Sequence, residues 1–83
     1  MATGGIIHLN VQRGMLVVQI DSGDCTVFEL MGGYDVKVGH RVNGDLDSSL
    51  CETLQNLSTG ESISVYVQGQ GCSPEHGRRL IWQ

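Results

Sequence analysis

The stretch GCSPEHGRRLIW, residues 71–82, places residue types that could do chemistry close together. Cys72 and His76 lie four positions apart, with the carboxylate of Glu75 between them. A thiol and an imidazole at this spacing are compatible with a reactive cysteine or with half of a zinc site. The same residues are also compatible with the first turn of a short helix, which would have no chemical role.

The order of residues after Cys72 favours the helix. Ser73 is a preferred N-cap residue, and Pro74 suits the first helical position. Glu75 follows, and its charge complements the positive end of a helix. We therefore expect residues 72–83 to form a C-terminal tail or a helical turn.

Cys72 also carries one chemical expectation. Its thiol would lie just before a helix N-terminus and close in sequence to two arginines, a setting that favours the thiolate. Cys72 is therefore the candidate reactive thiol. We expect it to be alkylated more readily than Cys25 and Cys51.

Metal binding and catalysis have little support in the rest of the chain. Structural zinc sites draw four Cys or His ligands, often as two close pairs, and the sequence offers one such pair. The sequence contains no G-x-S-x-G, H-E-x-x-H or P-loop motif. We expect no metal site, no catalytic residues and no cofactor, and a small enzyme ranks third among the candidate functions.

Length and composition indicate one small domain spanning residues 1–83. Apolar residues make up 40% of the chain and charged residues 17%, which argues against disorder. Five Lys and Arg against nine Asp and Glu give a formal net charge of −4, which disfavours nucleic acid as a partner. The cysteine spacing shows no disulfide framework, and we see no secretory leader or membrane span. We expect a cytoplasmic protein that binds no membrane.

Hydrophobic alternation predicts a mainly β chain. The clearest pattern is a hairpin in which MLVVQI and CTVFEL flank the turn DSGD. Leu50, Leu54 and Leu57 have helical spacing, which predicts a short helix before the last strand. Gly44 falls at an inward position of its strand and suggests a bulge or a tight bend. The expected elements are strands at 6–11, 15–20, 25–30, 41–46 and 62–68, a helix at 48–57, and a loose N-terminus at 1–5.

Five short strands in so small a chain suggest a highly curved sheet that closes into a five-stranded β-barrel. RGMLVVQIDSGDCTVFEL followed by VGHRVNGDL resembles OB-fold proteins, including S1-like domains, in its rhythm of strands and glycines. The resemblance covers residues 6–68 and implies a barrel that binds single-stranded nucleic acid. The helix expected before the last strand departs from the OB order and is closer to an SH3-like barrel, which is the alternative fold.

OB-like barrels bind single strands through basic grooves and exposed aromatic rings. Outward-facing residues of the expected fourth and last strands would share one face if those two strands lie close together. The candidate binding surface consists of Lys37, His40, Arg41, Asn43, Tyr66 and Gln68.

The apolar end of the tail offers a second candidate surface. Leu80, Ile81 and Trp82 pack either on the chain's own barrel or on another subunit, and they form the candidate interface. A non-enzymatic binding or interaction module, with a protein partner or a second copy of the chain, is therefore the leading function. An OB-like domain for single-stranded nucleic acid is the alternative.

Overall fold

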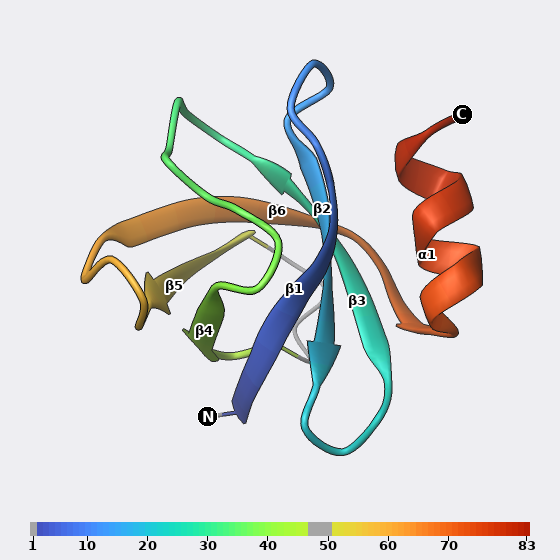
Figure 1. Ribbon diagram of the computed structural model, residues 1–83, viewed down its shortest axis with the longest axis horizontal. Helices are drawn as coiled ribbons and strands as arrows, with labels where there is room; N and C mark the ends of the chain where they lie inside the picture. The colour runs from blue at the N-terminus through green and yellow to red at the C-terminus, as the bar shows by residue number, and fades with distance from the viewer. Residues whose placement is uncertain (1, 47–50) are drawn as a thin grey trace.

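The computed structural model describes residues 2–46 and 51–83, and in this part of the chain six strands are followed by one helix (Figure 1). The strands curve around a common interior, and the helix lies outside them. The elements are β1 (Ala2–Asn10), β2 (Met15–Ile20), β3 (Cys25–Leu30), β4 (Arg41–Gly44), β5 (Cys51–Asn56), β6 (Ser62–Cys72) and α1 (Pro74–Ile81).

The strands close into an antiparallel barrel in the order β1-β2-β3-β6-β5-β4, with β4 pairing back onto β1. Two three-stranded meanders, β1-β2-β3 and β4-β5-β6, join through the β3–β6 and β1–β4 pairs. Closure pairs each described strand on both sides and so protects its edges. The predicted small, mainly β barrel is confirmed and is compatible with the OB-like resemblance, but it has six strands instead of five.

The predicted hairpin is confirmed with both strand ranges. β2 and β3 pair directly, and Gly23 adopts a positive φ of 114° in the turn between them. Inward side chains from the strands and their connecting segments form the main core of the barrel. This core contains Ile6, Leu16, Val18, Ile20, Phe28, Val36, Val42, Leu46, Leu54, Ile63, Val65 and Val67.

Residues 2–5, expected to be loose, form the first half of β1 instead. They pair with β4 on one side and with the end of β2 on the other. β1 and β2 approach each other closely at Gly4, where an added Cβ would lie 2.6 Å from the carbonyl oxygen of Gln19. The sequence ATGG carries no hydrophobic alternation, so only the closure of the barrel reveals this strand.

The helix predicted over residues 48–57 is wrong where the structure describes it, because Cys51–Asn56 forms strand β5. Residues 48–50 lie outside the described residues. Leu54 is fully buried whereas Leu57 is 57% exposed, so these two leucines do not share a buried helical face. Pairing with β4 and β6 on both sides outweighs the local leucine spacing. The SH3-like alternative rested on that helix and loses its support.

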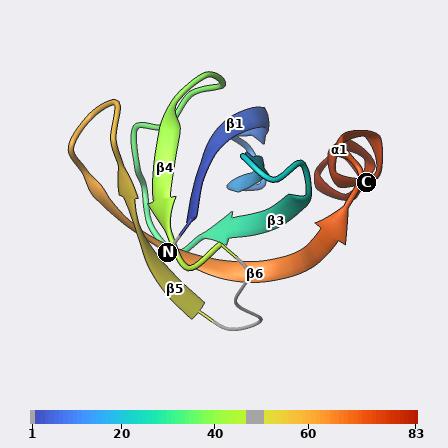
Figure 2. The same cartoon turned by 90° about the horizontal axis from the view of Figure 1, so that it is seen from below.

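The C-terminal tail forms α1, which packs on the outside of the barrel against β2 and β3 (Figures 1 and 2). The predicted start of the helix is confirmed: the Ser73 hydroxyl accepts a hydrogen bond from the His76 backbone N–H at 3.2 Å, and Pro74 is the first helical residue. A second apolar cluster fills the space between helix and sheet. It contains Met15, Val17, Cys25, Val27 and Ile81, with Ile7, Cys72 and Leu80 at its edge.

The tail therefore packs on its own barrel, one of the two alternatives that the sequence left open. Ile81 is fully buried, Leu80 is half-buried, and Trp82 is 58% exposed. Within the candidate interface, only Trp82 keeps a mostly exposed side chain that another molecule could contact.

Candidate binding groove

An apolar groove of about 430 Å³ opens where the β1–β2 turn meets the segment between β3 and β4. Leu9 and Leu30 lie at the ends of their strands, and the connecting segment contributes Tyr34 and Val36. The groove is lined by Leu9, Val11, Gly14, Leu30, Gly32, Gly33, Tyr34, Asp35, Val36 and Lys37.

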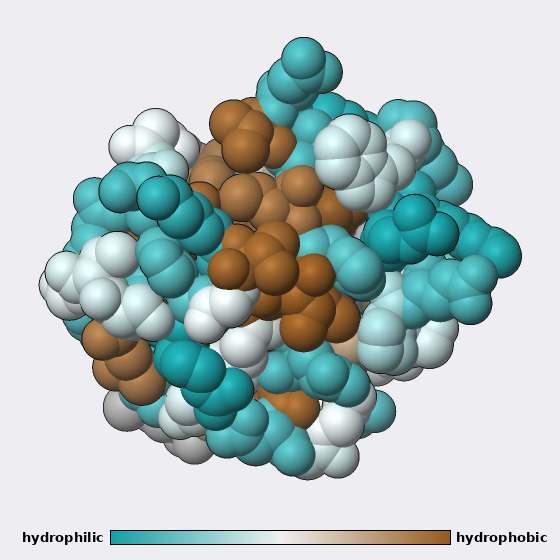
Figure 3. Space-filling model, viewed as in Figure 1, coloured by the Kyte–Doolittle hydropathy of each residue, from teal (hydrophilic) through white to brown (hydrophobic). Residues whose placement is uncertain are grey.

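The apolar surface of this groove continues from the main core. Leu9, Leu30 and Tyr34 are half-buried and pack against that core, so the folded barrel holds them in place. Val11 projects beside them with 78% of its surface exposed. Figure 3 shows a continuous hydrophobic area near the middle of this face, in the region of β1 and the segment that leads to β4, with hydrophilic residues around it.

The segment that closes one side of the groove is shaped by Gly32, which lies against the ring of Tyr34. A Cβ added at Gly32 would lie 3.3 Å from Tyr34 Cε2, closer than most side-chain contacts. Asp35 and Lys37 are exposed and are the charged residues among those that line the groove. The arrangement can take an apolar group inside and meet polar groups at its edge, as binding sites commonly do.

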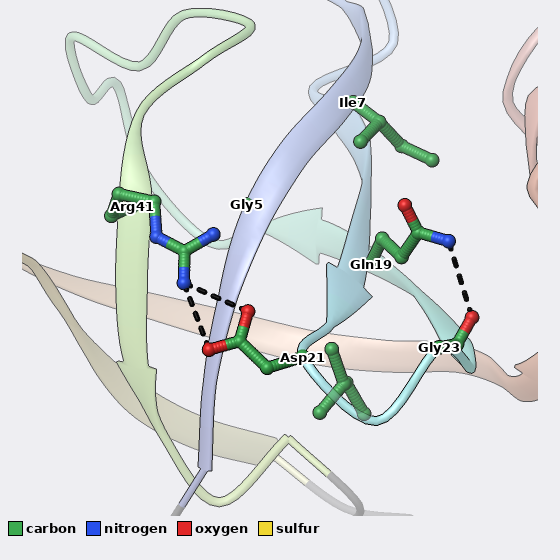
Figure 4. A pocket seen from close by; sticks show the side chains of 7 residues that line it. Gly5, Ile7, Gln19, Asp21, Gly23 and Arg41 are labelled. Carbon is green, nitrogen blue, oxygen red and sulfur yellow. Dashed lines mark hydrogen bonds and ion pairs between the residues drawn. The ribbon is translucent and has the colours of Figure 1, made fainter.

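Arg41 of the candidate binding surface is held by an ion pair. Its Nη2 lies 2.8 and 2.9 Å from the two carboxylate oxygens of Asp21 (Figure 4), and the two side chains are 48% and 62% exposed. The pair spans β1 at Gly5, where a Cβ would lie 3.3 Å from Arg41 Nη1. Glycine therefore leaves room for the guanidinium to cross β1. A hollow of about 350 Å³ beside the pair is also lined by Ile7 and Gln19.

Asn43 and His40 are engaged within the chain. Asn43 Nδ2 donates to the hydroxyl of Thr3 at 2.9 Å, which links β4 to β1. His40 Nδ1 lies 3.1 Å from Nδ2 of Asn56 and 3.3 Å from the backbone N–H of Lys37. These contacts fix the entry into β4, and they engage Nδ1 of His40 and Nδ2 of Asn43 within the chain.

Tyr66 and Gln68 lie on β6, and β5 separates β6 from β4 in the barrel. Tyr66 is 47% exposed, and Glu29 is its cross-strand partner on β3. Gln68 Nε2 donates to Glu29 Oε1 at 2.8 Å. The structure therefore does not place Arg41 and Asn43 on a strand adjacent to Tyr66 and Gln68, and it puts a carboxylate beside the aromatic ring.

The three cysteines are free thiols in different environments: Cys25 is buried, Cys72 is half-buried and Cys51 is exposed. Burial raises the pKa of Cys25, and the neighbouring Cys72 and Asp24 raise it further. The preferential alkylation of Cys72 stays a prediction, and Cys51 competes with it through greater exposure.

Within residues 2–46 and 51–83, His, Cys, Asp and Glu form no group of three or more that could hold a metal ion. No helix in the same described ranges is long and apolar enough to traverse a bilayer.

Sequence reasoning did not find the groove, because its two sides come from segments about twenty residues apart whose approach depends on barrel closure. One feature of the sequence does point to the groove. Val11 is the apolar first residue of the turn 11–14, a place where a side chain stays exposed unless a partner covers it. No protein-family model matches the chain, and no significant match is found among curated proteins or among solved structures.

Proposed function

We propose that this chain is a non-enzymatic binding module that takes an apolar segment of a protein partner into the groove at the end of its barrel. The groove itself carries the proposal: Leu9, Leu30 and Tyr34 form an apolar surface fixed by the core, and Val11 projects next to it. Removing apolar surface from water stabilises a complex by about 25 cal/mol per Å². A preformed apolar groove therefore favours binding without a costly rearrangement of the barrel.

A second copy of the chain is the partner to test first. One molecule carries both an apolar groove and an exposed apolar side chain, Val11, beside it. The net charge of −4 makes two copies repel each other at low salt. Because salt screens this repulsion and leaves apolar burial intact, self-association should strengthen with ionic strength.

Light scattering coupled to size exclusion, over rising protein concentrations and at two salt concentrations, tests self-association. We expect the mean mass of the wild-type protein to rise with concentration and with salt. Val11→Ser should shift that rise to higher concentration, because it removes the exposed apolar group. Leu57→Ser is the matched control: Leu57 is 57% exposed and is not among the residues that line the groove.

A strictly monomeric wild-type protein at the highest concentration would exclude the second copy as partner. Titration with short apolar peptides, followed by NMR, then tests the groove directly. Chemical-shift changes centred on Leu9, Leu30 and Tyr34 would support the proposal. Binding that leaves these three residues unaffected would contradict it.

Single-stranded nucleic acid is the second candidate, and the exposed ring of Tyr66 is the observation in its favour. Glu29 opposite that ring and the pairing of Arg41 with Asp21 count against it. Binding of short single-stranded DNA and RNA at low salt tests this candidate. Loss of binding in Tyr66→Ala would support it, and no binding by the wild-type protein would end it, because phosphate attraction is strongest at low salt.

A small enzyme stays third, and a cytoplasmic location stays a prediction. The charged side chains that line the groove, Asp35 and Lys37, are both exposed at its edge. That placement suits recognition of a partner's polar groups better than acid–base chemistry in a site shielded from water.

A further inference from the structure

Two of the three cysteines face each other across neighbouring strands. Cys25 is the first residue of β3, Cys72 is the last residue of β6, and they are cross-strand partners. Cys25 belongs to the apolar cluster that α1 covers, and Cys72 packs against the edge of that cluster. Cys25 is fully buried and Cys72 is half-buried. Cys51 lies elsewhere, on β5 opposite Tyr66, and is exposed.

A bulge in β6 creates this pairing. Val27 pairs with Gly69, so a regular ladder would set Gly71 opposite Cys25. The register shifts by one residue instead, Gly71 adopts a positive φ of 66°, and Cys72 takes the place opposite Cys25. Bulges commonly re-aim a side chain in this way, and glycine tolerates the backbone conformation.

The spacing of opposed residues suits a disulfide. Directly opposite residues in antiparallel strands have Cα atoms about 4.5 or 5.5 Å apart. Disulfides join Cα atoms about 4.4–6.8 Å apart. Because cross-strand partners point to the same face of the sheet, a disulfide between Cys25 and Cys72 would keep the backbone pairing. The Cys72 thiol would give up its hydrogen bond of 3.7 Å to the carbonyl oxygen of Gln70.

We propose that Cys25 and Cys72 are a redox modification site, at which a peroxide forms a reversible disulfide that fastens the start of α1 to the barrel. The half-buried Cys72 reacts first: its thiolate attacks hydrogen peroxide, the O–O bond breaks, and Cys72 sulfenic acid and hydroxide are formed. The Cys25 sulfur then attacks the sulfenic sulfur. The S–S bond forms, and the departing hydroxyl takes the Cys25 proton and leaves as water. In total, two thiols are oxidised and one peroxide is reduced to two waters.

The order of these steps follows from the surroundings of each thiol. Burial keeps Cys25 away from solvent and raises its pKa, and the nearby Cys72 and Asp24 raise it further, so Cys25 is a poor first nucleophile. Cys72 is reached from solvent, and it directly precedes Ser73, the N-cap of α1.

The disulfide would act on the helix as well as on the two strands. The far end of α1 is already held, because Asn10 donates to the Ile81 carbonyl at 2.7 Å. A bond at Cys72 would fix the near end, so α1 would be anchored at both ends. The cross-link would also enclose the chain between residues 25 and 72, a long loop whose closure restricts the unfolded chain.

Oxidation of the full chain with hydrogen peroxide tests the proposal, with alkylation of the remaining thiols and peptide mass mapping as the readout. Cys51→Ser is the decisive variant, because the change is at an exposed position and leaves the proposed pair as the remaining thiols. We expect this variant to lose both free thiols within one chain, to yield a linked Cys25–Cys72 peptide, and to regain both thiols with dithiothreitol. Its melting temperature should be more than ~10 °C higher when oxidised.

Cys72→Ser and Cys25→Ala, each in the Cys51→Ser background, are the controls that lack one partner. Each should keep a single thiol, form no link within the chain, and show no oxidation-dependent rise in melting temperature. The proposal fails if the folded Cys51→Ser protein keeps both thiols after peroxide treatment. It also fails if the linked peptides join two different chains. Both outcomes are independent of the groove, whose lining residues do not include these cysteines.

Discussion

Asn10 Nδ2 donates a hydrogen bond of 2.7 Å to the carbonyl oxygen of Ile81, which joins the end of β1 to the last turn of α1. Asn10 is 4% exposed and Ile81 is fully buried, so the contact is shielded from water. The last carbonyl groups of a helix have no partner within the helix and need one elsewhere. A buried side chain of the barrel therefore completes the end of α1.

We expect Asn10→Ala to lower the free energy of unfolding by about 1–3 kcal/mol, because a buried carbonyl loses its short hydrogen bond. Arg13 Nη1 also reaches the Ile81 carbonyl, at 3.5 Å, and would offset part of the loss. Urea unfolding measures the change. Gln12→Ala, in the exposed turn that follows β1, is the control and should stay within about 0.5 kcal/mol of the wild-type value. Equal effects of the two substitutions would contradict the anchoring role of Asn10.

Gly77 allows α1 to lie close to the barrel. It is buried, and a Cβ there would lie 2.9 Å from Val17 Cγ1 and 3.6 Å from Val27 Cγ2. In an exposed helix interior, glycine to alanine stabilises by about 1 kcal/mol. Here we expect Gly77→Ala to destabilise by about 1–3 kcal/mol, because the branched Val17 side chain has little freedom to move away.

A double-mutant cycle separates this close contact from a general effect on the helix. In a Val17→Ala background the added methyl group has room, so Gly77→Ala should then be neutral or stabilising. Thermal and urea unfolding of the four proteins give the coupling between the two positions. A Gly77→Ala effect of the same size in both backgrounds would show that Val17 is not what makes glycine necessary.

The raised pKa of Cys25 predicts a loss of stability at alkaline pH. Its pKa in the folded protein lies above the ordinary value of 9.0, mainly because burial disfavours the thiolate. As the pH rises through that ordinary value, the unfolded chain loses the Cys25 proton while the folded chain keeps it. The unfolded state is then stabilised relative to the folded state, so the free energy of unfolding falls until the raised pKa is passed.

Comparison with Cys25→Ala isolates this contribution from the other groups that titrate at high pH. Under reducing conditions, the stability difference between wild type and Cys25→Ala should be constant below about pH 8 and should shrink above the ordinary thiol pKa. A wild-type advantage that stays constant up to strongly alkaline pH would contradict the raised pKa of Cys25.

The parts of the fold that the sequence predicted well are those set by neighbouring residues. The β2–β3 hairpin follows from two β-rich runs and the turn DSGD between them, all within residues 15–30. The start of α1 follows from Ser73 and Pro74 alone. In these places local preferences and the final structure agree, so no distant contact is needed to choose between alternatives.

The predictions that do not hold concern elements whose structure depends on residues far away in the sequence. β5 is a strand because Val42 and Asn43 of β4 lie on one side and β6 lies on the other, and these contacts override a leucine spacing typical of helices. β5 lies between β4 and β6, so Arg41 and Tyr66 of the candidate binding surface are not on neighbouring strands. The sequence pattern does not reveal this separation. The groove likewise needs the β1–β2 turn and the segment before β4 to meet.

Gly44 is the inward position of β4 that the sequence predicted as a bulge or a tight bend. The residue is buried and has a φ of 156°, and a Cβ there would lie 2.6 Å from Cδ2 and 3.5 Å from Cα of Leu54. We expect Gly44→Ala to destabilise by at least about 2 kcal/mol, because Leu54 is fully buried and the backbone angle is unfavourable for alanine.

Gly33→Ala is the matched control for this last substitution, because a Cβ at Gly33 meets nothing within 4 Å and the backbone angle there is not in the left-handed region. Reduced freedom of the unfolded chain should make Gly33→Ala neutral or stabilising by up to about 1 kcal/mol. Urea unfolding of both variants compares a methyl group added in the packed interior at position 44 with one added in an open loop at position 33. A Gly44→Ala protein as stable as Gly33→Ala would mean that β4 can move outward, and that the barrel is less tightly closed at Leu54 than these distances indicate.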